Sequence, residues 1–351
     1  MFHIGIAPFI NSGDFPFGSV IMKTARLLFS YLVYLLIVPS WQVAHAETYK
    51  IATDIQADGT AGRLLVEFTS QVEQRTQGRV KFKLFHGGVL GDQLQYFQHL
   101  QRGVVDIGLI NSASLEAVIP AFGVMNMPYL FRTAEEYRQV MDNDEFRRAL
   151  FESSRKHRFI FLGYLSSDFR SIYSTRPIQS ISDLHALRLR TISSKTYIAM
   201  LERFGAVPVV LPFGELYSAM QQGVVDGAEG GSAGLYEAKF SDVAKHVVLT
   251  EHTRLTDFVV ASTRFQQRLL PSDLAIVNEE FARISAKSIA FAEEKEQLLK
   301  QKAMAEAGVQ FFAVDKGPLV RAVAPLYQKA LKDAEKAPLL KTIFTIEKRC
   351  E

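Results

Sequence analysis

The four residues Gly103-Val104-Val105-Asp106 recur as Gly223-Val224-Val225-Asp226, and the surroundings of the two copies match. Upstream of each copy lies a stretch typical of a strand, followed by one typical of a helix: 78–85 and 92–100 before the first, 205–211 and 213–220 before the second. The copies themselves are predicted to be short buried strands. The sequence therefore predicts a β-α-β unit present twice, which favours two similar α/β lobes around a ligand cleft.

Strand and helix patterns alternate along most of the chain, as expected for a parallel-rich α/β sheet in each lobe. The continuous apolar run 159–164 predicts a strand buried on both faces. After Pro271, apolar residues recur at helical spacing with no further glycine or proline until Gly308. This pattern predicts a helix roughly 50 Å long, which is longer than one lobe.

We expect the two lobes to be joined by several crossing strands and by this long helix, which would span both. Lobe I is predicted to comprise residues 47–167 and 256–295, and lobe II residues 168–255 and 296–351. The resulting fold class is α/β, with a ligand cleft between the lobes as in periplasmic binding proteins.

Residues 1–46 have the features of a secretory signal region. A short basic start at Met22–Arg26 precedes an uncharged, mostly apolar run at 27–38, and Ala44-His45-Ala46 supplies small residues for cleavage. The pattern predicts Met22 as the natural start, cleavage after Ala46 and a periplasmic location. An uncleaved N-terminal anchor is the alternative.

Composition excludes several classes of function. Removal of Lys23, Arg26 and Asp14 with the signal region would reduce 40 basic and 37 acidic residues to 38 and 36, a balance that argues against nucleic-acid binding. Cys350 is the only cysteine, and the eight histidines show no metal-ligand spacing. No P-loop is present. We therefore expect no metal site and no cofactor.

One motif suggests an enzyme. The stretch Gly230-Gly231-Ser232-Ala233-Gly234 matches the nucleophile elbow of serine hydrolases. The catalytic triad also needs a histidine on a separate later loop. The last histidine, His252, follows Ser232 by only twenty residues. A serine hydrolase using Ser232 therefore remains a remote alternative, and a glycine-rich turn is the simpler interpretation.

Arginines at predicted strand ends are the better candidates for a binding site. Arg170 follows the predicted strand at 159–164, and Arg190 ends the alternating stretch 187–190. Ligands in open α/β sheets bind outside the carboxyl ends of the strands. The planar guanidinium can hold a carboxylate through two parallel hydrogen bonds. Arg188 is instead expected to be a surface charge or part of a structural ion pair.

Several motifs together resemble the DctP family of solute-binding proteins of tripartite ATP-independent periplasmic (TRAP) transporters. The central part of the resemblance consists of 187–191 (Leu-Arg-Leu-Arg-Thr), 207–220 (Val-Pro-Val-Val-Leu-Pro-Phe-Gly-Glu-Leu-Tyr-Ser-Ala-Met) and 223–229 (Gly-Val-Val-Asp-Gly-Ala-Glu). The other landmarks follow in the right order at 90–92 (Leu-Gly-Asp), 127–131 (Met-Pro-Tyr-Leu-Phe) and 169–171 (Phe-Arg-Ser). The similarity extends from residue 49 to about 315.

The resemblance implies roles for individual residues. Arg190 would pair with the ligand carboxylate, Arg170 would support the ligand and Phe213 would pack on it. Gly230 departs from the asparagine of many members, and Asn111 and Ser114 stand where other members carry charged groups. The predicted ligand-binding set is Asp54, Gln93, Asn111, Arg170, Arg190, Phe213, Glu229 and Gly230, and no catalytic residue is expected.

The resemblance also implies a function. The protein would capture a small organic acid and deliver it to the membrane subunits of a TRAP permease, as a monomer and without catalysis. The stretches 169–173 and 250–252 are similar to members that take sugar acids, which favours a uronate or aldonate over a C4-dicarboxylate or another carboxylate. A periplasmic ligand sensor would share every one of these residues and is the alternative.

Overall fold

The computed structural model describes residues 47–152 and 157–349, which lie within one compact unit. The predicted signal region lies outside the described residues. The strands are β1 (Glu47–Ala52), β2 (Val80–Phe85), β3 (Ile107–Asn111), β4 (Phe159–Ser174), β5 (Arg188–Thr191), β6 (Val207–Val210), β7 (Gly227–Gly230), β8 (His246–Ser262) and β9 (Gln310–Ala313). The helices are α2 (Thr60–Arg75), α3 (Gln93–Gln101), α4 (Ser112–Val118), α5 (Ala134–Asp142), α6 (Asp144–Glu152), α7 (Lys195–Arg203), α8 (Leu216–Gln221), α9 (Ser232–Glu237), α10 (Thr263–Arg268), α11 (Pro271–Ala307), α12 (Gly317–Ala330) and α13 (Lys336–Ile346).

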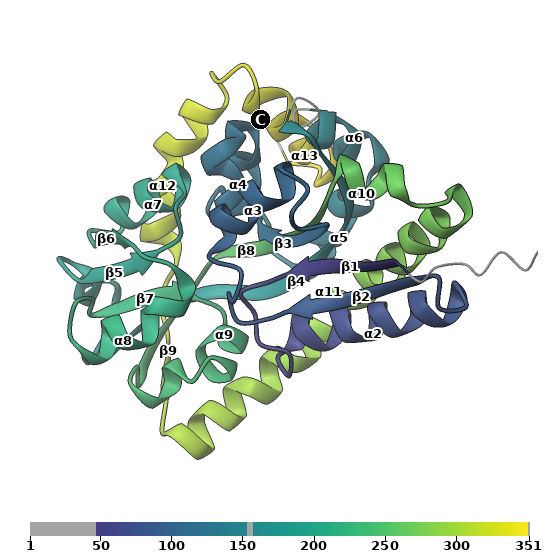
Figure 1. Cartoon of the computed structure of the whole chain (residues 1–351). Helices are drawn as coiled ribbons and strands as arrows, with labels where there is room; N and C mark the ends of the chain where they lie inside the picture. Colours follow the sequence, from purple (N-terminus) through teal and green to yellow (C-terminus); the bar gives the residue numbers. More distant parts are fainter. Residues whose placement is uncertain (1–46, 153–156, 350–351) are drawn as a thin grey trace, which may run out of the picture. The chain divides into compact units, whose positions relative to one another are not determined.

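The strands form one sheet in the order β2-β1-β3-β8-β4-β7-β5-β6, with β9 beside β8 (Figure 1). Its two ends are built alike. In one, β1 lies parallel between β2 and β3, and in the other, β5 lies parallel between β6 and β7. We call β2-β1-β3 the first half-sheet and β6-β5-β7 the second. The repeated strand order confirms the predicted β-α-β duplication.

The repeated Gly-Val-Val-Asp sequence has the same conformation in both copies. Gly103 and Gly223 end α3 and α8 with φ angles of 70° and 69°, which glycine adopts without a steric cost. The carboxylate of Asp106 accepts a hydrogen bond from the Lys50 amide at 2.8 Å. The carboxylate of Asp226 accepts one from the Arg188 amide at 2.9 Å. Asp106 thus connects the start of β3 to β1, and Asp226 connects the start of β7 to β5.

The prediction that these two copies are themselves buried strands is wrong. They form the turn between helix and strand, and β3 and β7 begin at the next residue, 107 or 227. Val104 and Val224 are about half exposed, whereas Val105 and Val225 are buried. The left-handed glycine and the aspartate side chain impose a turn that the apolar Val-Val pair does not reveal.

Two long antiparallel strands connect the half-sheets. β8 pairs with β3 of the first half-sheet and with β4, and β4 pairs in turn with β7 of the second. The strand predicted at 159–164 therefore continues to Ser174, and Arg170 lies inside it rather than after it. The register of β4 against β8 shifts at three places, all of which lie between Phe161 and Ile172. The polar residues at these bulges resemble a strand end in the sequence, which explains the error.

The long helix α11 runs from Pro271 to Ala307 and ends at Gly308, whose φ of 67° terminates it. Its 37 residues span about 55 Å. The ring of Phe281 stacks on Phe68 of α2 at 3.7 Å between centroids, and the distal part of α11 contacts α9. The helix therefore packs against both halves of the fold, as predicted (Figure 1).

Serines of α11 also compensate for the irregular hydrogen bonding of β4. The amides of Tyr164 and Ser166 donate to the hydroxyls of Ser285 and Ser288, both at 3.0 Å. Gly163 permits this approach, since a Cβ there would lie 2.8 Å from the Ser285 hydroxyl. The bulged strand and the helix are thereby fixed to each other at the crossing point.

Each half-sheet has a hydrophobic core on both of its faces. Phe68 and Phe281 belong to the core on the α2 and α11 side of the first half-sheet, and Phe122 and Phe258 to the core on its other side. Two further clusters cover the second half-sheet. This arrangement fits the predicted two-lobed α/β fold, and the exact lobe boundaries stay a prediction. Within 47–152 and 157–349, no helix is long and apolar enough to cross a membrane.

Candidate ligand-binding site

A cavity of about 370 Å³ lies between the two half-sheets, close to the crossing strands β4 and β8. Its size is within the range of small-molecule sites. The structure places all eight residues of the predicted set around it: Asp54, Gln93, Asn111, Arg170, Arg190, Phe213, Glu229 and Gly230. These residues come from both halves of the fold. Most of them lie at the carboxyl ends of strands, where ligands bind in open α/β sheets.

Arg190, in β5, presents an unpaired guanidinium to this cavity. The side chain is 4% exposed, and its Nε donates to the Leu211 carbonyl at 2.9 Å. The guanidinium carbon lies 5.9 Å from the ring centroid of Phe213. No carboxylate of the described residues accepts a hydrogen bond from Arg190. Burial lowers the pKa of this guanidinium, which remains a cation because an arginine pKa is normally above 12.

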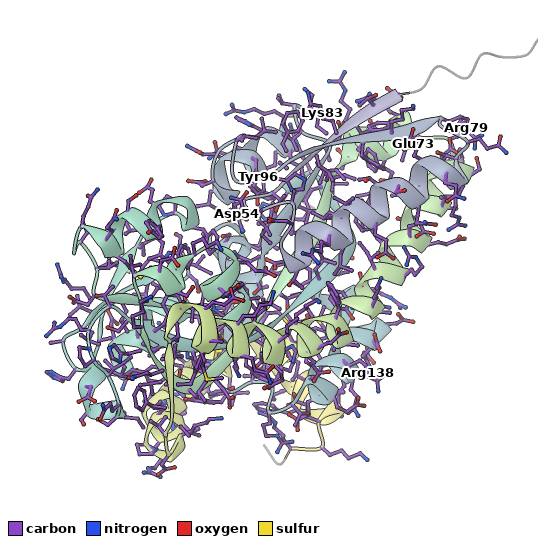
Figure 2. All side chains as sticks on the ribbon, turned by 90° about the horizontal axis from the view of Figure 1, so that it is seen from below. Asp54, Glu73, Arg79, Lys83, Tyr96 and Arg138 are labelled. Carbon is purple, nitrogen blue, oxygen red and sulfur yellow. The ribbon has the colours of Figure 1, made fainter. Side chains whose placement is uncertain are left out.

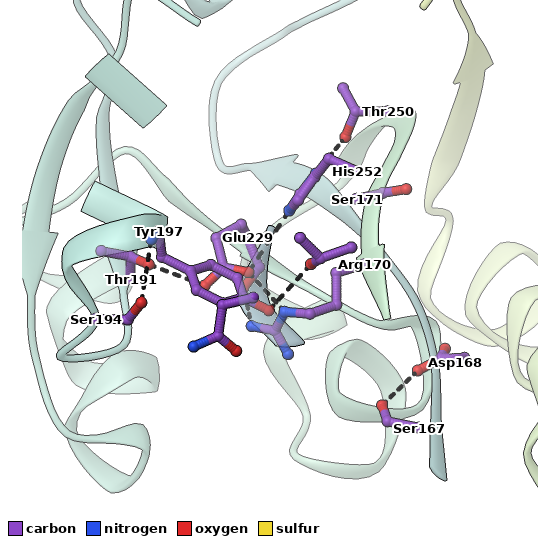
Figure 3. A network of polar contacts seen from close by, with 12 residues as sticks. Ser167, Asp168, Arg170, Ser171, Thr191, Ser194, Tyr197, Glu229, Thr250 and His252 are labelled. Carbon is purple, nitrogen blue, oxygen red and sulfur yellow. Dashed lines mark hydrogen bonds and ion pairs between the residues drawn. The ribbon is translucent and has the colours of Figure 1, made fainter. Parts of the chain in front are cut away.

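Arg170, by contrast, is already paired with a carboxylate. Its Nε donates to Glu229 Oε2 at 2.6 Å, and a terminal nitrogen donates to the Glu229 carbonyl at 2.8 Å (Figure 3). Glu229 also accepts from the Thr191 hydroxyl at 3.1 Å. Burial alone would raise the pKa of Glu229, but the charge and hydrogen bond of Arg170, together with the contact to His252, lower it to about 2. Glu229 therefore acts on the cavity mainly by fixing Arg170.

His252 completes this network on the side away from the cavity. Its Nδ1 is 2.8 Å from the Thr250 hydroxyl, and its Nε2 is 3.7 Å from Glu229 Oε2 (Figure 3). Burial lowers the pKa of the imidazole. A neutral imidazole leaves the Arg170–Glu229 pair with no net charge. Arg190 is thus the unbalanced cation on this wall of the cavity.

Gly230 makes room for an aromatic ring. A Cβ at this position would lie 2.8 Å from the ring of Tyr173, which lines the same cavity. The departure from asparagine is therefore accompanied by a tyrosine that occupies the adjoining space. Tyr173 was not identified from the sequence, since only the packing shows where its ring lies.

The opposite wall comes from the first half-sheet. Asp54 follows β1, Gln93 begins α3 and Asn111 ends β3. The side-chain nitrogen of Gln93 donates to both carboxylate oxygens of Asp54, at 3.1 and 3.0 Å. Its side-chain oxygen accepts a hydrogen bond from the backbone amide of Asn111 at 2.9 Å. Burial raises the pKa of Asp54. Asp54 lies toward the second half of the fold, unlike the outward-pointing Lys83 and Arg138 (Figure 2).

Four acidic residues that line the cavity are missing from the predicted set, and one of them, Asp92, is the N-cap of α3. Asp257 lies within β8, Asp168 within β4 and Glu237 at the end of α9. Burial, together with the neighbouring Asp54, raises the pKa of Asp257 to about 7. Residues 253–258 (Thr-Arg-Leu-Thr-Asp-Phe) do not alternate between polar and apolar, so the sequence carries no signal that places Asp257 at the cavity. Glu237 gives no such signal either, because its partner Thr60 is 177 residues away.

Among the described residues, no histidine is placed to act as a general base for Ser232. Ser232 is the first residue of α9, and the Asp168 carboxylate accepts from the next amide, that of Ala233, at 3.1 Å. Gly231 allows this contact, since a Cβ there would lie 1.9 Å from Asp168 Oδ1. No histidine among the described residues forms a hydrogen bond with Ser232, and His252 faces Glu229 instead. The motif therefore serves as a helix start next to the cavity.

Arg188 behaves as predicted for a structural ion pair. Its side chain is 46% exposed and pairs with Asp226 at 2.9 Å. It does not line the cavity, although it is only two residues from Arg190 on the same strand.

Comparison with known proteins places the chain in a family. Residues 52–333 match the model of the bacterial extracellular solute-binding protein family 7, DctP. The protein YiiZ of Salmonella typhimurium is 35% identical over 259 residues, which cover 73% of this chain and 79% of YiiZ. The 2,3-diketo-L-gulonate-binding periplasmic protein YiaO of Escherichia coli is 27% identical over 256 residues, which cover 70% of this chain and 74% of YiaO.

Solved structures agree with this placement. The TRAP periplasmic solute-binding protein of Anaerococcus prevotii, with bound D-glucuronate, superposes with a TM-score of 0.81 at 28% identity, over 86% of this chain and 98% of the other. Together with the family match over most of the sequence and the two-lobed fold, this similarity shows that the chain belongs to the DctP family of TRAP periplasmic solute-binding proteins.

Proposed function

We propose that this protein binds a sugar acid, a uronate or an aldonate, in the cavity between its half-sheets and delivers it to a TRAP permease. The observation that carries the proposal is the buried, unpaired guanidinium of Arg190, which faces a cavity of sugar-acid size. A ligand carboxylate would supply the partner that the described residues do not. Polar groups such as Asp54 and Gln93 would then face the hydroxyl groups of the ligand.

The ligands of the relatives support this choice of substrate class. At 28% identity to this chain, the protein of Anaerococcus prevotii holds glucuronate, that of Bradyrhizobium holds galacturonate and that of Polaromonas holds D-erythronate. A C4-dicarboxylate is the second candidate, because the C4-dicarboxylate-binding protein of Rhodobacter capsulatus is 27% identical. The carboxylates on the wall opposite Arg190 favour a ligand with only one carboxylate.

The remaining parts of the proposal follow from the family. The protein would act in the periplasm after removal of the signal region, as a monomer, and would perform no catalysis. The eight predicted residues would contact or position the ligand, with Arg190 pairing to its carboxylate, Arg170 supporting it and Phe213 packing on it.

A thermal-shift screen tests the substrate class. The panel comprises uronates, aldonates, C4-dicarboxylates, keto acids and aromatic acids. Ligand at a hundred times its Kd stabilises the folded state by about 2.7 kcal/mol, which raises the melting temperature of a chain of this size by roughly 4 °C. We expect such shifts from uronates or aldonates. A shift confined to C4-dicarboxylates would instead support the second candidate. Permease genes beside the coding gene would favour delivery, and a histidine-kinase gene alone would favour sensing.

A further inference from the structure

Asp257 is a buried carboxylate that faces the cavity without a hydrogen-bond partner. The residue is 8% exposed and lies in β8, opposite Asn111 of β3 and Leu165 of β4. No described residue donates a hydrogen bond to its carboxylate, although it borders the cavity directly. The fold alone gives no reason for this residue, because burial of an unpaired carboxylate is unfavourable.

The cavity is polarised between its two walls. Asp54 follows β1 and Asp257 pairs with Asn111 of β3, so both border the cavity on the side of the first half-sheet, and the charge of Asp54 raises the pKa of Asp257. Arg190 and Arg170 lie on the opposite wall, and their charges act on Asp54 and Asp257 across the cavity. A ligand that joins the two walls therefore needs an anionic end toward the arginines and a hydrogen-bond-donating end toward the aspartates.

We propose that Asp257 is a specificity-determining residue that selects hydroxylated monocarboxylates and rejects ligands with a second carboxylate. This inference rests on the proposed function and deepens it. Hydroxyl groups at the far end of a sugar acid would donate hydrogen bonds to the free oxygens of Asp257. A second carboxylate at that end would meet two like charges in a cavity from which water is largely excluded, where such repulsion is strong. Sites built for a hydroxyl group reject analogues that lack it.

This selectivity should depend on pH. Asp257 faces Asp54, which follows β1, and Arg170 in β4, and the phenol of Tyr96 in α3 interacts with both aspartates. Lys295 of α11 also borders the cavity, but its ammonium lies over the ring of Phe291 at 5.2 Å. Near pH 8 Asp257 is mostly ionised and rejects a carboxylate. Near pH 5.5 it is protonated, so it can donate a hydrogen bond to one.

The test compares ligands that share a carbon skeleton. Calorimetry measures the binding of D-galacturonate against galactarate, and of D-glucuronate against D-glucarate, at pH 8 and pH 5.5. These ligands stay ionised throughout, because ordinary carboxyl groups titrate near pH 4. For the wild type we expect the uronate to bind at least about tenfold more tightly at pH 8, or 1.4 kcal/mol. The preference should fall severalfold at pH 5.5.

Two variants assign the effect to Asp257. Asp257→Asn keeps the shape and removes the charge, so the preference at pH 8 should fall below about threefold and no longer change with pH. Asp106→Asn is the matched control, because it makes the same change at a buried aspartate outside the cavity. The preference of Asp106→Asn for the uronate over the dicarboxylate should equal that of the wild type at both pH values.

The outcomes separate the two proposals. A wild type that binds uronates and an Asp257→Asn variant with an unchanged, pH-dependent preference would overturn the role of Asp257 and leave the proposed function intact. Equal affinity of the wild type for uronates and for the corresponding dicarboxylates at pH 8 would also overturn the role of Asp257. If no sugar acid binds the wild type, the proposed function fails and this inference fails with it.

Discussion

At the scale of single residues, the cavity is defined by which charges have partners and which do not. Arg170 is neutralised by Glu229, and Arg188 by Asp226. Arg190 is left unpaired on one wall and Asp257 on the other. Buried charges that the fold does not pair are typical of functional sites.

Removal of the Arg190 guanidinium should nearly abolish ligand binding. Loss of one partner of a buried ion pair costs about 3–5 kcal/mol, or roughly a hundred- to several-thousand-fold in Kd. Arg190→Ala should therefore bind the best uronate of the screen at least a hundredfold more weakly by calorimetry. Arg190→Lys should also be weak, because an ammonium cannot form the two parallel hydrogen bonds.

Arg188→Ala is the matched control for that experiment. It removes an arginine two positions away on the same strand, whose partner is Asp226. Affinity should stay within about threefold of the wild type, or roughly 0.6 kcal/mol. An Arg190→Ala variant that binds as tightly as Arg188→Ala would contradict the assigned role of Arg190.

Asp257 should reduce the stability of the closed arrangement, in which its carboxylate is buried, at high pH. Its folded-state pKa of about 7 lies above the ordinary value of 3.8, so the folded state holds the proton longer. Stability then falls as pH rises from about 4 to about 7 and stays lower above that range. Asp257→Asn removes this effect. The variant should gain up to roughly 4 kcal/mol at pH 8 and less than about 1 kcal/mol at pH 4.

Urea unfolding of the ligand-free wild type and Asp257→Asn at the two pH values measures this gain. The difference between the proteins is the relevant quantity, because the pKa of Glu347 is also raised to about 7 and affects both alike. A gain that is equal at pH 4 and pH 8 would show that Asp257 does not titrate between these values.

At the scale of elements, one contact joins a helix of each half across the cavity. The N-cap residue of α2, Gly59, provides no side-chain hydrogen bond. Glu237 of α9 takes that place, accepting from the Thr60 amide at 3.1 and 3.0 Å and from the Thr60 hydroxyl at 2.7 Å. A carboxylate at a helix N-terminus is favoured by the free amides and by the helix dipole.

The Glu237 contact should therefore stabilise the closed form. Helix caps contribute about 0.5–2 kcal/mol, so Glu237→Gln should weaken uronate binding by roughly two- to thirtyfold, mainly through faster release. Thr133→Ala is the control, since Thr133 caps α5 by accepting from Glu136 at 3.1 Å within one half of the fold. Its affinity should not change. Equal losses in the two variants, measured by calorimetry and stopped-flow release, would refute a closing role for Glu237.

At the scale of the whole molecule, the candidate site lies deep between the two half-sheets. Arg190, Arg170, Asn111 and Asp257 are all less than 9% exposed, although they border the cavity. We therefore expect the half-sheets to separate for ligand entry, with bending at the crossing strands β4 and β8 and at α11, which connect them. Hinge closure around a ligand is the usual solution for two-lobed binding proteins.

The ligand-free protein should accordingly populate an open form. Small-angle X-ray scattering with and without a saturating uronate should give a smaller radius of gyration for the bound state. Contacts made only in the closed form, among them those of Arg190, provide the difference in affinity that such a shift requires. Superimposable profiles at full occupancy would argue for a rigid receptor. With the same uronate bound, Glu237→Gln should have a larger radius of gyration than the wild type.

The sequence by itself determined the repeated unit, the long helix and two arginines that line the cavity. These features depend on local information: hydrophobic periodicity, glycine at left-handed positions and motifs that resemble a family. The ligand-binding roles of the eight residues, which the structure gathers at one cavity, stay predictions until binding is measured.

Only the tertiary structure decided how charges are paired and where strands continue. Arg170 and Glu229 are 59 residues apart, and Glu237 and Thr60 are 177 apart, so no local pattern links them. The continuation of β4 to Ser174 depends on hydroxyl groups of α11 that satisfy its bulged backbone. Asp257 becomes a functional candidate only because folding buries it beside Asp54 and leaves its carboxylate unpaired. Burial and pairing are properties of the assembled chain, and they decide which of its charges remain available to a ligand.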